Sequence, residues 1–409
     1  MKINLILVIF YFSISYIPAL GSLDRSTTQW LILGILNLIS FLKLSFDNYN
    51  FKNNLSEIIK SKIVKSYSLF ITICLISIFY SINQVESLVV FIRFLTQFIS
   101  FVLILILFES IKLEFKTFTI ILASGALLES FALNYTFISN YQIGVEYGRS
   151  AINKGLSSNI NIAAFSLVMK IPFVVHFITY FFKKFKLLII GVTILSSIFF
   201  SIYLTGSRGA VLAVYFQLLF VIILHFFVKG ENKKFHEKFT KIFLSGLIIS
   251  LIINNFLFDT LRVSYRTQQI IERGSESRIE YYNQALQSIF DKPILGNGIG
   301  TWKIISNYYD RFTMEGYTVQ YNVHNDFLQI FTEIGVIGFI SYVLIFVFFI
   351  LKLLKKINNT ITIPILIFIS SYLIDANLNF PIERPMIQIM LLFTIAYSIH
   401  KFKRDAFEV

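Results

Sequence analysis

The sequence predicts an all-α integral membrane protein with about twelve transmembrane helices. Of its 409 residues, 56% are hydrophobic and only 14% are charged, and the mean hydropathy is +0.72. A soluble domain carries about 25% charged residues, so folding as a soluble globule would leave much apolar surface uncovered. The apolar runs are continuous and do not alternate, which favours helices over a barrel. We therefore expect residues 1–409 to form a single polytopic membrane domain.

The expected spans are apolar stretches close to the 17–25 residues that cross a bilayer as a helix. The last two are short, so their ends are the least well defined by the pattern. The twelve stretches are 3–20, 28–46, 66–82, 88–108, 117–137, 159–182, 187–204, 209–228, 242–258, 326–351, 360–374 and 386–400.

The basic residues of the connections predict the orientation. If the N-terminus is cytoplasmic, the inner segments hold 22 basic residues and the outer segments hold 12, as the positive-inside rule requires. Both termini are then cytoplasmic. The first span has the alternative of being a cleaved signal peptide, because Lys2 precedes an apolar core and Ala19–Leu20–Gly21 supplies small residues. Cleavage would leave the downstream orientation unchanged.

One outer connection differs from the others. Segment 259–325 has 67 residues, 14 formal charges, seven tyrosines and Trp302. Loops of this length usually have a function, so we expect an extracytoplasmic loop, partly helical, that carries part of the active site. A helix over 276–290 is predicted from apolar residues spaced for one face. These residues are Ile279, Tyr282, Leu286 and Ile289.

Arginine and lysine are segregated between the two sides. Lysine accounts for 21 of the 22 inner basic residues, whereas nine of the 12 outer ones are arginine. Arginine grips phosphate with a planar fork and keeps its proton when partly buried. An anionic ligand such as a diphosphate is therefore expected outside, and the net charge of +13 does not indicate nucleic-acid binding. The alternative is pairing with the loop's own acids. The nine arginines are Arg25, Arg149, Arg208, Arg262, Arg266, Arg273, Arg278, Arg311 and Arg384.

Two cations fall within predicted spans. Arg93 lies about five residues from the outer end of its span, and an intramembrane charge is expensive unless it is paired or functional. We therefore expect Arg93 to contribute to substrate binding, together with Arg149 of the second-longest outer connection. Lys170 is nearer mid-span, where helix packing or snorkelling is as good an interpretation as a function.

His324 opens the tenth span and is the candidate base. Asn325 or Asp326 can cap the helix, and Gln329 and Glu333 share the face beneath His324. The helix N-terminus adds positive potential, and histidine takes up a proton near neutral pH. The alternative role for this histidine is that of a cap or interface residue. The histidines lack metal-ligand spacing, so we expect no metal and no other cofactor.

Glycines mark three further positions. Gly335 and Gly338 allow another helix to approach closely. Thr205–Gly206–Ser207–Arg208 is expected to turn span seven into span eight, with Ser207 as the cap and Arg208 in the first helical turn. The segment 293–302 contains Gly296, Gly298 and Gly300, whose backbone could bind an anion, although we favour a plain tight turn.

These motifs together resemble the O-antigen ligase and O-antigen polymerase superfamily of bacterial membrane glycosyltransferases. The resemblance covers about residues 200–350 and depends on the order of short motifs. The motifs are Thr205–Gly206–Ser207–Arg208–Gly209, Ser277–Arg278–Ile279–Glu280, Pro293 through Thr301, His324–Asn325 through Glu333, Gly335 and Gly338.

The resemblance implies a GT-C-like fold and a metal-independent, inverting transfer of a glycan from undecaprenyl diphosphate to a hydroxyl on the periplasmic face of the bacterial inner membrane. Arg208 and Arg278 would hold the diphosphate, and His324 would orient or deprotonate the acceptor hydroxyl. The family often has tryptophan shortly after the second arginine, whereas Tyr281 and Tyr282 stand here. Their rings could stack on sugars, or they could be buried loop aromatics.

Several functions fit this pattern. A ligase acting on a lipid A–core acceptor is favoured because one dominant outer loop is present. A polymerase would use another lipid-linked glycan, and a protein-glycosylating relative would use a side-chain hydroxyl. A transporter or flippase for lipid-linked glycans would require charges through the depth of the bundle and internal repeats. A non-catalytic envelope partner is the remaining alternative.

Overall fold

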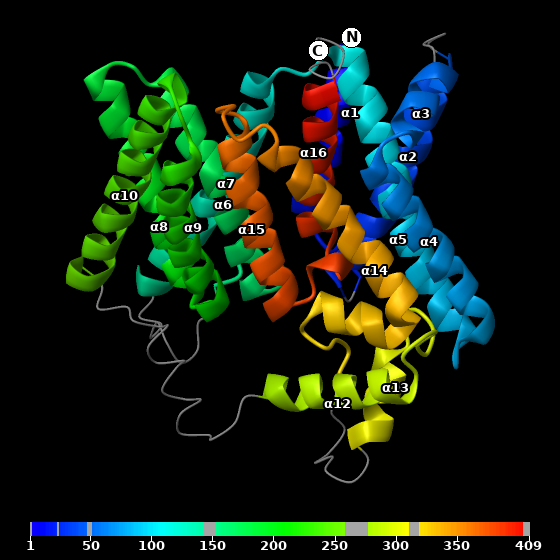
Figure 1. Cartoon of the computed structure of the whole chain (residues 1–409). Helices are drawn as coiled ribbons and strands as arrows, with labels where there is room; N and C mark the ends of the chain where they lie inside the picture. Colours follow the sequence, from blue (N-terminus) through cyan, green and yellow to red (C-terminus); the bar gives the residue numbers. More distant parts are fainter. Residues whose placement is uncertain are drawn as a thin grey trace. The chain divides into compact units, whose positions relative to one another are not determined.

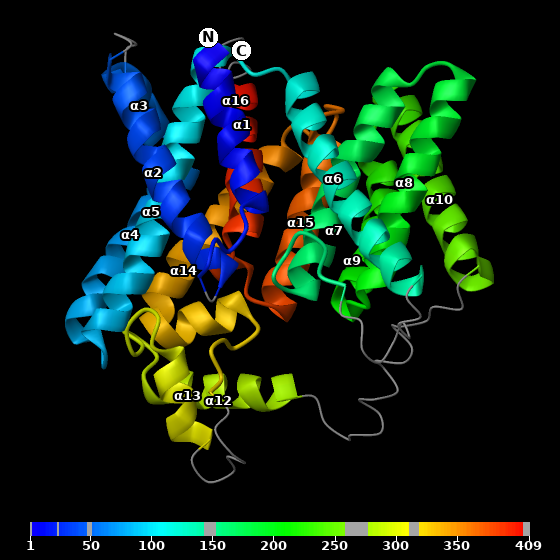
Figure 2. The ribbon, with the colours of Figure 1, turned by 180° about the vertical axis from the view of Figure 1, so that it is seen from behind.

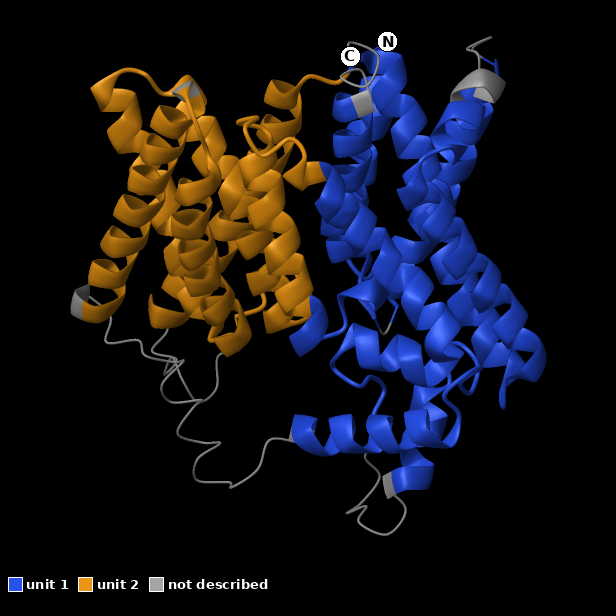
Figure 3. Cartoon of the chain, in the orientation of Figure 1, with its two compact units in different colours: residues 1–112, 276–352, 376–409 blue, residues 113–275, 353–375 orange. Residues whose placement is uncertain are grey.

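A computed structural model describes residues 2–22, 24–46, 51–142, 153–257, 277–310 and 319–403. Within these residues all regular structure is helical. The chain divides into two compact units, which Figure 3 shows in different colours and which we describe separately. Unit 1 comprises residues 1–112, 276–352 and 376–409, and unit 2 comprises residues 113–275 and 353–375. The expectation of one polytopic membrane domain stays a prediction.

Unit 1 contains the two ends of the chain and the helices of the predicted outer loop. Its elements are α1 (Lys2–Ser13), η1 (Ile14–Tyr16), α2 (Arg25–Phe46), α3 (Phe51–Ile59), α4 (Lys62–Tyr80), α5 (Gln84–Ile111), α12 (Ser277–Asp291), α13 (Trp302–Asp310), α14 (Asp326–Leu354), η2 (Pro381–Glu383) and α16 (Pro385–Lys403).

Unit 2 is made of the middle of the chain. Its elements are α6 (Phe115–Gln142), α7 (Ile160–Phe181), α8 (Phe185–Thr205), α9 (Arg208–Phe227), α10 (Glu231–Leu257) and most of α15 (Thr362–Leu378).

The predicted membrane spans coincide with helices. Within the described chain, α2, α4, α5, α6, α7, α8, α9, α14 and α16 are the nine helices long and apolar enough to cross a membrane. The predicted stretches 3–20 and 360–374 correspond to shorter apolar helices, and stretch 242–258 falls in α10, which is outside the nine. A multi-pass helical membrane protein is therefore confirmed, whereas the count of twelve stays a prediction.

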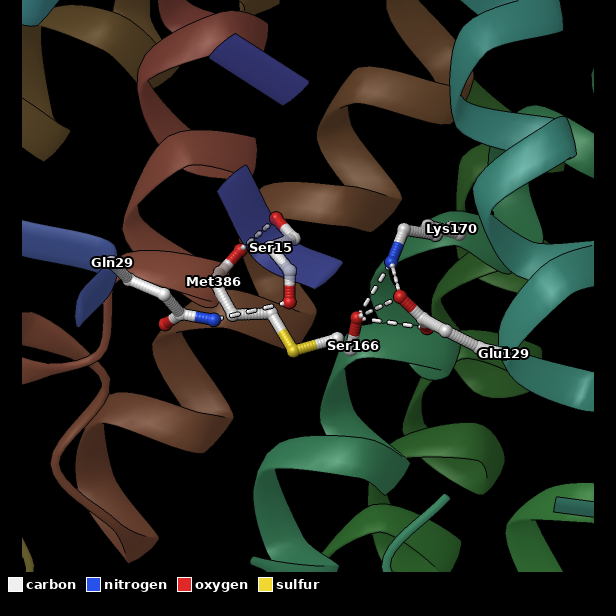
Figure 4. A network of polar contacts seen from close by, with 6 residues as sticks. All are labelled: Ser15, Gln29, Glu129, Ser166, Lys170 and Met386. Carbon is white, nitrogen blue, oxygen red and sulfur yellow. Dashed lines mark hydrogen bonds and ion pairs between the residues drawn. The ribbon is translucent and has the colours of Figure 1, made fainter. Parts of the chain in front are cut away.

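The helices of unit 1 place its chain ends and its loop helices at opposite ends. Figures 1 and 2 both show the start of α1 beside the end of α16, with α12 and α13 at the far end of the same unit. Polar contacts join the N-terminal elements to α16: the Gln29 side chain donates to the Ser15 carbonyl over 3.2 Å, and the Ser15 hydroxyl donates to the Met386 carbonyl over 3.4 Å (Figure 4).

Helix α14 is broken after its second turn. Ile334 and Gly335 leave helical geometry, with Gly335 at φ 65° and ψ −171°, and the ribbon changes direction there (Figure 1). The loop before α13 fills the break, because Val336 donates its N–H to the Pro293 carbonyl over 2.9 Å. A Cβ at Gly335 would lie 2.0 Å from the Ile294 oxygen.

These contacts correct the prediction that Gly335 and Gly338 admit another helix. At Gly335 the close neighbour is the backbone of the glycine-rich loop, not a helix. A Cβ at Gly338 would meet the Ile334 side chain of α14 itself, 2.3 Å away. Both glycines therefore serve the break in α14 rather than a helix crossing.

Helix α12 confirms the helix predicted over 276–290, but only part of the predicted apolar face is buried: Ile289 is buried and Tyr282 packs against the cluster described below. Ile279 and Leu286 are exposed. The buried face contains Ala285, which packs with Trp302 and Val323 in a small cluster. Small side chains let α12 lie close against its neighbours, a possibility that a search for large apolar residues overlooks.

The turn before α9 is confirmed in unit 2, although its cap differs. Gly206 adopts the left-handed conformation that ends α8, and Arg208 begins α9. Ser207 does not cap α9 with its side chain. Its hydroxyl instead donates to the Asn161 amide oxygen over 2.8 Å, which ties the turn to α7.

Candidate functional site

A polar cavity of about 550 Å³ lies in unit 1. It is lined by the start of α2, the first turns of α5, α12, the glycine-rich turn, α13, the loop before α14, the first turns of α14 and the segment around η2. All of its lining residues belong to unit 1. Three cations and four carboxylates line it: Arg93, Lys303, Arg384, Asp24, Glu86, Glu333 and Glu383.

His324 lies at the edge of this cavity and is contacted from several sides. Its backbone is left-handed, with φ 61°, and the Tyr282 hydroxyl lies 3.1 Å from its carbonyl oxygen, to which it can donate. The imidazole stacks on Tyr281 at a centroid distance of 6.2 Å and meets Phe380 edge-on at 5.0 Å. A strained backbone that is fixed by several neighbours is typical of functional positions.

The His324 imidazole is neutral, and one of its ring nitrogens has no hydrogen-bond partner. Burial, together with the positive charges of Arg278 and Arg384, lowers the pKa of His324 to about 4. Its Nδ1 has no hydrogen-bond partner among the described residues. At neutral pH this ring can therefore accept a hydrogen bond or a proton from a hydroxyl group in the cavity.

Arg384 and Asp24 bring the two ends of the chain together. Nη1 of Arg384 lies 3.5 Å from Oδ2 of Asp24, and the guanidinium packs on the Phe380 ring, 4.6 Å from its centroid. Burial opposes ionisation of Asp24, but hydrogen bonds from Ser26 and the charges of Arg384 and Arg93 outweigh it, so the pKa of Asp24 is lowered. Asp24 therefore stays ionised and pairs with Arg384.

Glu383 sits beside these groups in a buried position. Burial raises the pKa of Glu383, although Arg384 and Arg93 act in the opposite direction. Gln329 donates to Oε1 of Glu383 over 3.3 Å, and the Gln329 amide oxygen accepts the Val323 N–H over 3.2 Å. Gln329 thus connects η2 to the loop that carries His324.

Glu333 holds the glycine-rich turn from inside. Its carboxylate accepts the N–H of Gly300 over 2.8 Å and that of Trp302 over 3.1 Å. Its backbone oxygen accepts the N–H of Gly298 over 2.7 Å. The N–H groups of this turn therefore bind oxygen atoms of the protein itself, which supports the tight turn favoured from the sequence.

Half of the ten predicted site residues line this cavity. Arg93, Tyr281, His324, Gln329 and Glu333 all line the cavity. Asn325 caps α14, because its side chain accepts the Leu328 N–H over 3.1 Å.

Three other predicted residues lie elsewhere. Arg278 is not a lining residue, but its charge acts on His324. Arg208 lies in unit 2, and Arg149 lies outside the described residues.

Several cavity residues were not among the predicted site residues. Arg384 was counted with the outer arginines, and its position in the short sequence Glu383–Arg384–Pro385 gave no sign of its role. Lys303 pairs with Glu86, with 2.6 Å between Nζ and Oε1. The missed set comprises Asp24, Ser26, Thr27, Glu86, Val90, Gly300, Lys303, Val319, Gln320, Tyr321, Asn322, Phe380, Glu383 and Arg384.

A second group of polar side chains lies in unit 2 and is closed. Lys170, fully buried, donates to Glu129 over 2.5 Å and to the Ser166 hydroxyl over 2.6 Å. Ser166 in turn donates to the same carboxylate over 2.9 Å (Figure 4). Lys170 therefore does not snorkel. It joins α7 to α6 through a buried ion pair, which favours the packing interpretation.

The sequence model of the O-antigen ligase family matches residues 191–343, a segment that contains Arg208, Arg278 and His324. The predicted family resemblance is confirmed. A protein of Haemophilus influenzae, named "Uncharacterized protein", is 24% identical over 384 residues, or 87% of this chain and 86% of that relative.

Two rickettsial proteins are named "Putative polysaccharide ligase". The one from Rickettsia conorii is 30% identical over 128 residues, which are 29% of this chain and 30% of that protein. The one from Rickettsia felis is 27% identical over 173 residues, which are 38% of this chain and 42% of that protein. The matches thus span less than half the length of either rickettsial protein.

Proposed function

We propose that this protein is an O-antigen ligase-like glycosyltransferase. It would move a glycan from undecaprenyl diphosphate to a hydroxyl of lipid A–core, on the periplasmic face of the bacterial inner membrane. The observation that supports this best is a neutral His324 with an unpartnered Nδ1 at the edge of a polar cavity. The family match over residues 191–343 supplies the reaction class.

In the proposed step, the acceptor hydroxyl donates its hydrogen bond to Nδ1 of His324. The hydroxyl oxygen attacks the anomeric carbon from the face opposite the diphosphate, the bond from that carbon to the diphosphate oxygen breaks, and the electron pair leaves with the diphosphate. His324 takes up the proton. A pKa of about 4 makes His324 a weak base, so the proton moves late, after the new bond has made the hydroxyl acidic.

Arginines would stabilise the charge that builds on the departing diphosphate, since fixed cations need no reorganisation during the reaction. Arg278 has this role in the proposal because its charge already acts on His324. Arg208 and Arg149 are retained as diphosphate ligands on the strength of the sequence alone. Both chain ends would be cytoplasmic, which fits the opposite placement of α12 from the ends of α1 and α16 within unit 1.

The test is the surface polysaccharide of a deletion strain separated on a gel, with the chain supplied again in wild-type or variant form. We expect the deletion strain and His324→Ala to lose long glycan on lipid A and to accumulate long lipid-linked polymer. Gln287→Ala, an exposed change on α12 outside the cavity lining, should restore wild-type glycan. Protein amount is followed by immunoblot.

The same gel separates the alternatives. Accumulation of a single-repeat product would indicate a polymerase in place of a ligase. Unchanged glycan on lipid A with His324→Ala present at wild-type amount would contradict the enzyme proposal altogether.

A further inference from the structure

The cavity beside His324 carries positive charges that are already neutralised by the protein. Arg384 lies against Asp24, and Lys303 lies against Glu86. The charge of Arg93 acts on both Asp24 and Glu383. Each of the three cations of the lining therefore already faces at least one carboxyl group of the protein, so none of them is free for a diphosphate.

The polar atoms left without partners in this lining are mainly hydrogen-bond acceptors. Oε1 of Gln320 and Oδ1 of Asn322 are buried acceptors with no hydrogen-bond partner among the described residues. Nδ1 of His324 is likewise unpartnered and is a third acceptor in the neutral tautomer protonated at Nε2, whereas Nε of Arg384 is the corresponding donor. An ionised phosphate only accepts hydrogen bonds, so it would leave the three acceptors unsatisfied. A sugar hydroxyl both donates and accepts, and so it can satisfy either kind of atom.

The size and the aromatic groups of the cavity fit the same ligand. A volume of about 550 Å³ falls in the range of about 300–1,000 Å³ for small-molecule sites. Tyr321 is 66% exposed, and the Tyr281 ring stacks against the His324 ring. Such rings give an apolar face to the carbon skeleton of a sugar while the polar atoms take its hydroxyls.

From these contacts we propose that the cavity is a subsite for an uncharged, hydroxyl-rich sugar unit of the acceptor, and that it excludes phosphate. This inference rests on the proposed function and deepens it. Arg93 and Arg384 then orient hydroxyls together with Asp24 and Glu383, and Arg93 is not a diphosphate ligand. The donor's diphosphate lies on the side of Arg278, so the two substrates meet at His324.

The test uses a reporter cysteine in the purified full-length protein held in a lipid nanodisc. Val319 lines the cavity and is 43% exposed, while the native Cys74 is buried. The rate at which a water-soluble maleimide labels Val319→Cys is measured with three kinds of probe. These are the methyl glycosides of glucose, galactose and mannose, the 6-phosphates of the same three sugars, and inorganic pyrophosphate.

We expect at least one neutral glycoside to slow labelling, by about tenfold at ten times its dissociation constant, and we expect the phosphates and pyrophosphate to leave the rate unchanged. Adding Asn322→Ala should abolish the protection, because the alanine removes an acceptor that makes no bond within the described protein. Gln287→Cys, exposed on α12 and outside the cavity lining, is the control and should label at one rate throughout.

Protection by pyrophosphate or by a sugar phosphate equal to that by the neutral glycosides would overturn the inference. Absence of protection by all three neutral glycosides would overturn it too. Labelling does not require transfer, so the two proposals fail separately. Protection by a neutral glycoside alongside an unaffected surface glycan in His324→Ala would refute the enzyme and leave the sugar subsite standing.

Discussion

The cavity of unit 1 and the buried cluster of unit 2 are built from the same chemical groups, but they differ in what they leave available. In unit 2, Lys170, Glu129 and Ser166 satisfy one another inside the helix pair α6–α7. In unit 1, the ion pairs are similar, yet His324 and Asn322 keep acceptors without partners beside a cavity. The closed arrangement fits a structural role, whereas the open one fits ligand binding. Charge pairs alone therefore do not mark a site.

The largest expected loss of stability comes from breaking the closed cluster of Lys170, Glu129 and Ser166. Lys170→Ala leaves the Glu129 carboxylate buried without its cation, which costs about 3–5 kcal/mol. The protein should accumulate poorly and unfold at a lower temperature in detergent. The double variant Lys170→Met with Glu129→Gln removes both charges and should recover most of the loss. If the double variant is no better than the single one, the ion pair is not what Lys170 contributes.

A smaller loss of stability is expected when the carboxylate of Glu333, which supports the cavity of unit 1, is removed. Glu333→Ala leaves the N–H groups of Gly300 and Trp302 without their acceptor, at about 1–3 kcal/mol for each buried donor. Both unfolding temperature and glycan transfer should fall, because the same turn packs against the break in α14. Glu333→Gln keeps an acceptor oxygen and should lose less. If Glu333→Ala and Glu333→Gln lower the unfolding temperature equally, the hydrogen bonds of this carboxylate are not what stabilises the turn.

The break in α14 gives a further stability prediction. Gly335→Ala adds a Cβ that would lie 2.0 Å from the Ile294 oxygen, at a φ of 65°, a backbone conformation that costs about 1–3 kcal/mol in residues other than glycine. The measurement is the unfolding midpoint in detergent. The matched control is Gly34→Ala, where a Cβ would meet nothing within 4 Å. Identical midpoints for both alanine variants would contradict the account of the break.

The smallest expected effect concerns pH. A base works when it is deprotonated, so the wild-type rate should fall as the pH drops through about 4, the pKa of His324. Arg278→Gln removes one of the charges that lower this pKa, so the acid limb should move to higher pH, by less than about one unit. Arg278→Lys keeps the charge and should keep the limb in place. The normalised pH–rate profile checks this, and an unmoved limb in Arg278→Gln would contradict it.

The sequence predicted the parts of this arrangement that depend on local pattern. Continuous apolar runs predicted the helices, and the spacing of Gln329 and Glu333 placed both below His324. The cost of an intramembrane charge singled out Arg93. These inferences need only helix geometry and the free-energy cost of a charge in lipid, and both can be judged from a few neighbouring residues.

The remaining features depend on contacts between distant segments. Asp24 and Arg384 stand near opposite ends of the chain, so their pairing has no local pattern. Gly335 was interpreted as a helix-packing position because its actual neighbour, the Ile294 backbone, belongs to a loop. Part of the buried face of α12 was missed because it uses Ala285, a small residue that contributes little to an apolar pattern. Sequence periodicity predicts that a segment is helical, but it does not predict which other segment packs against the helix.

The central claim is that His324 accepts the proton of the acceptor hydroxyl. The direct measurement is single-turnover glycan transfer by the purified protein in nanodiscs, with lipid-linked glycan and lipid A–core extracted from the deletion strain. The account predicts that His324→Ala transfers about 100- to 10,000-fold more slowly than the wild type, with an unchanged unfolding temperature. Transfer by His324→Ala at the wild-type rate would contradict it.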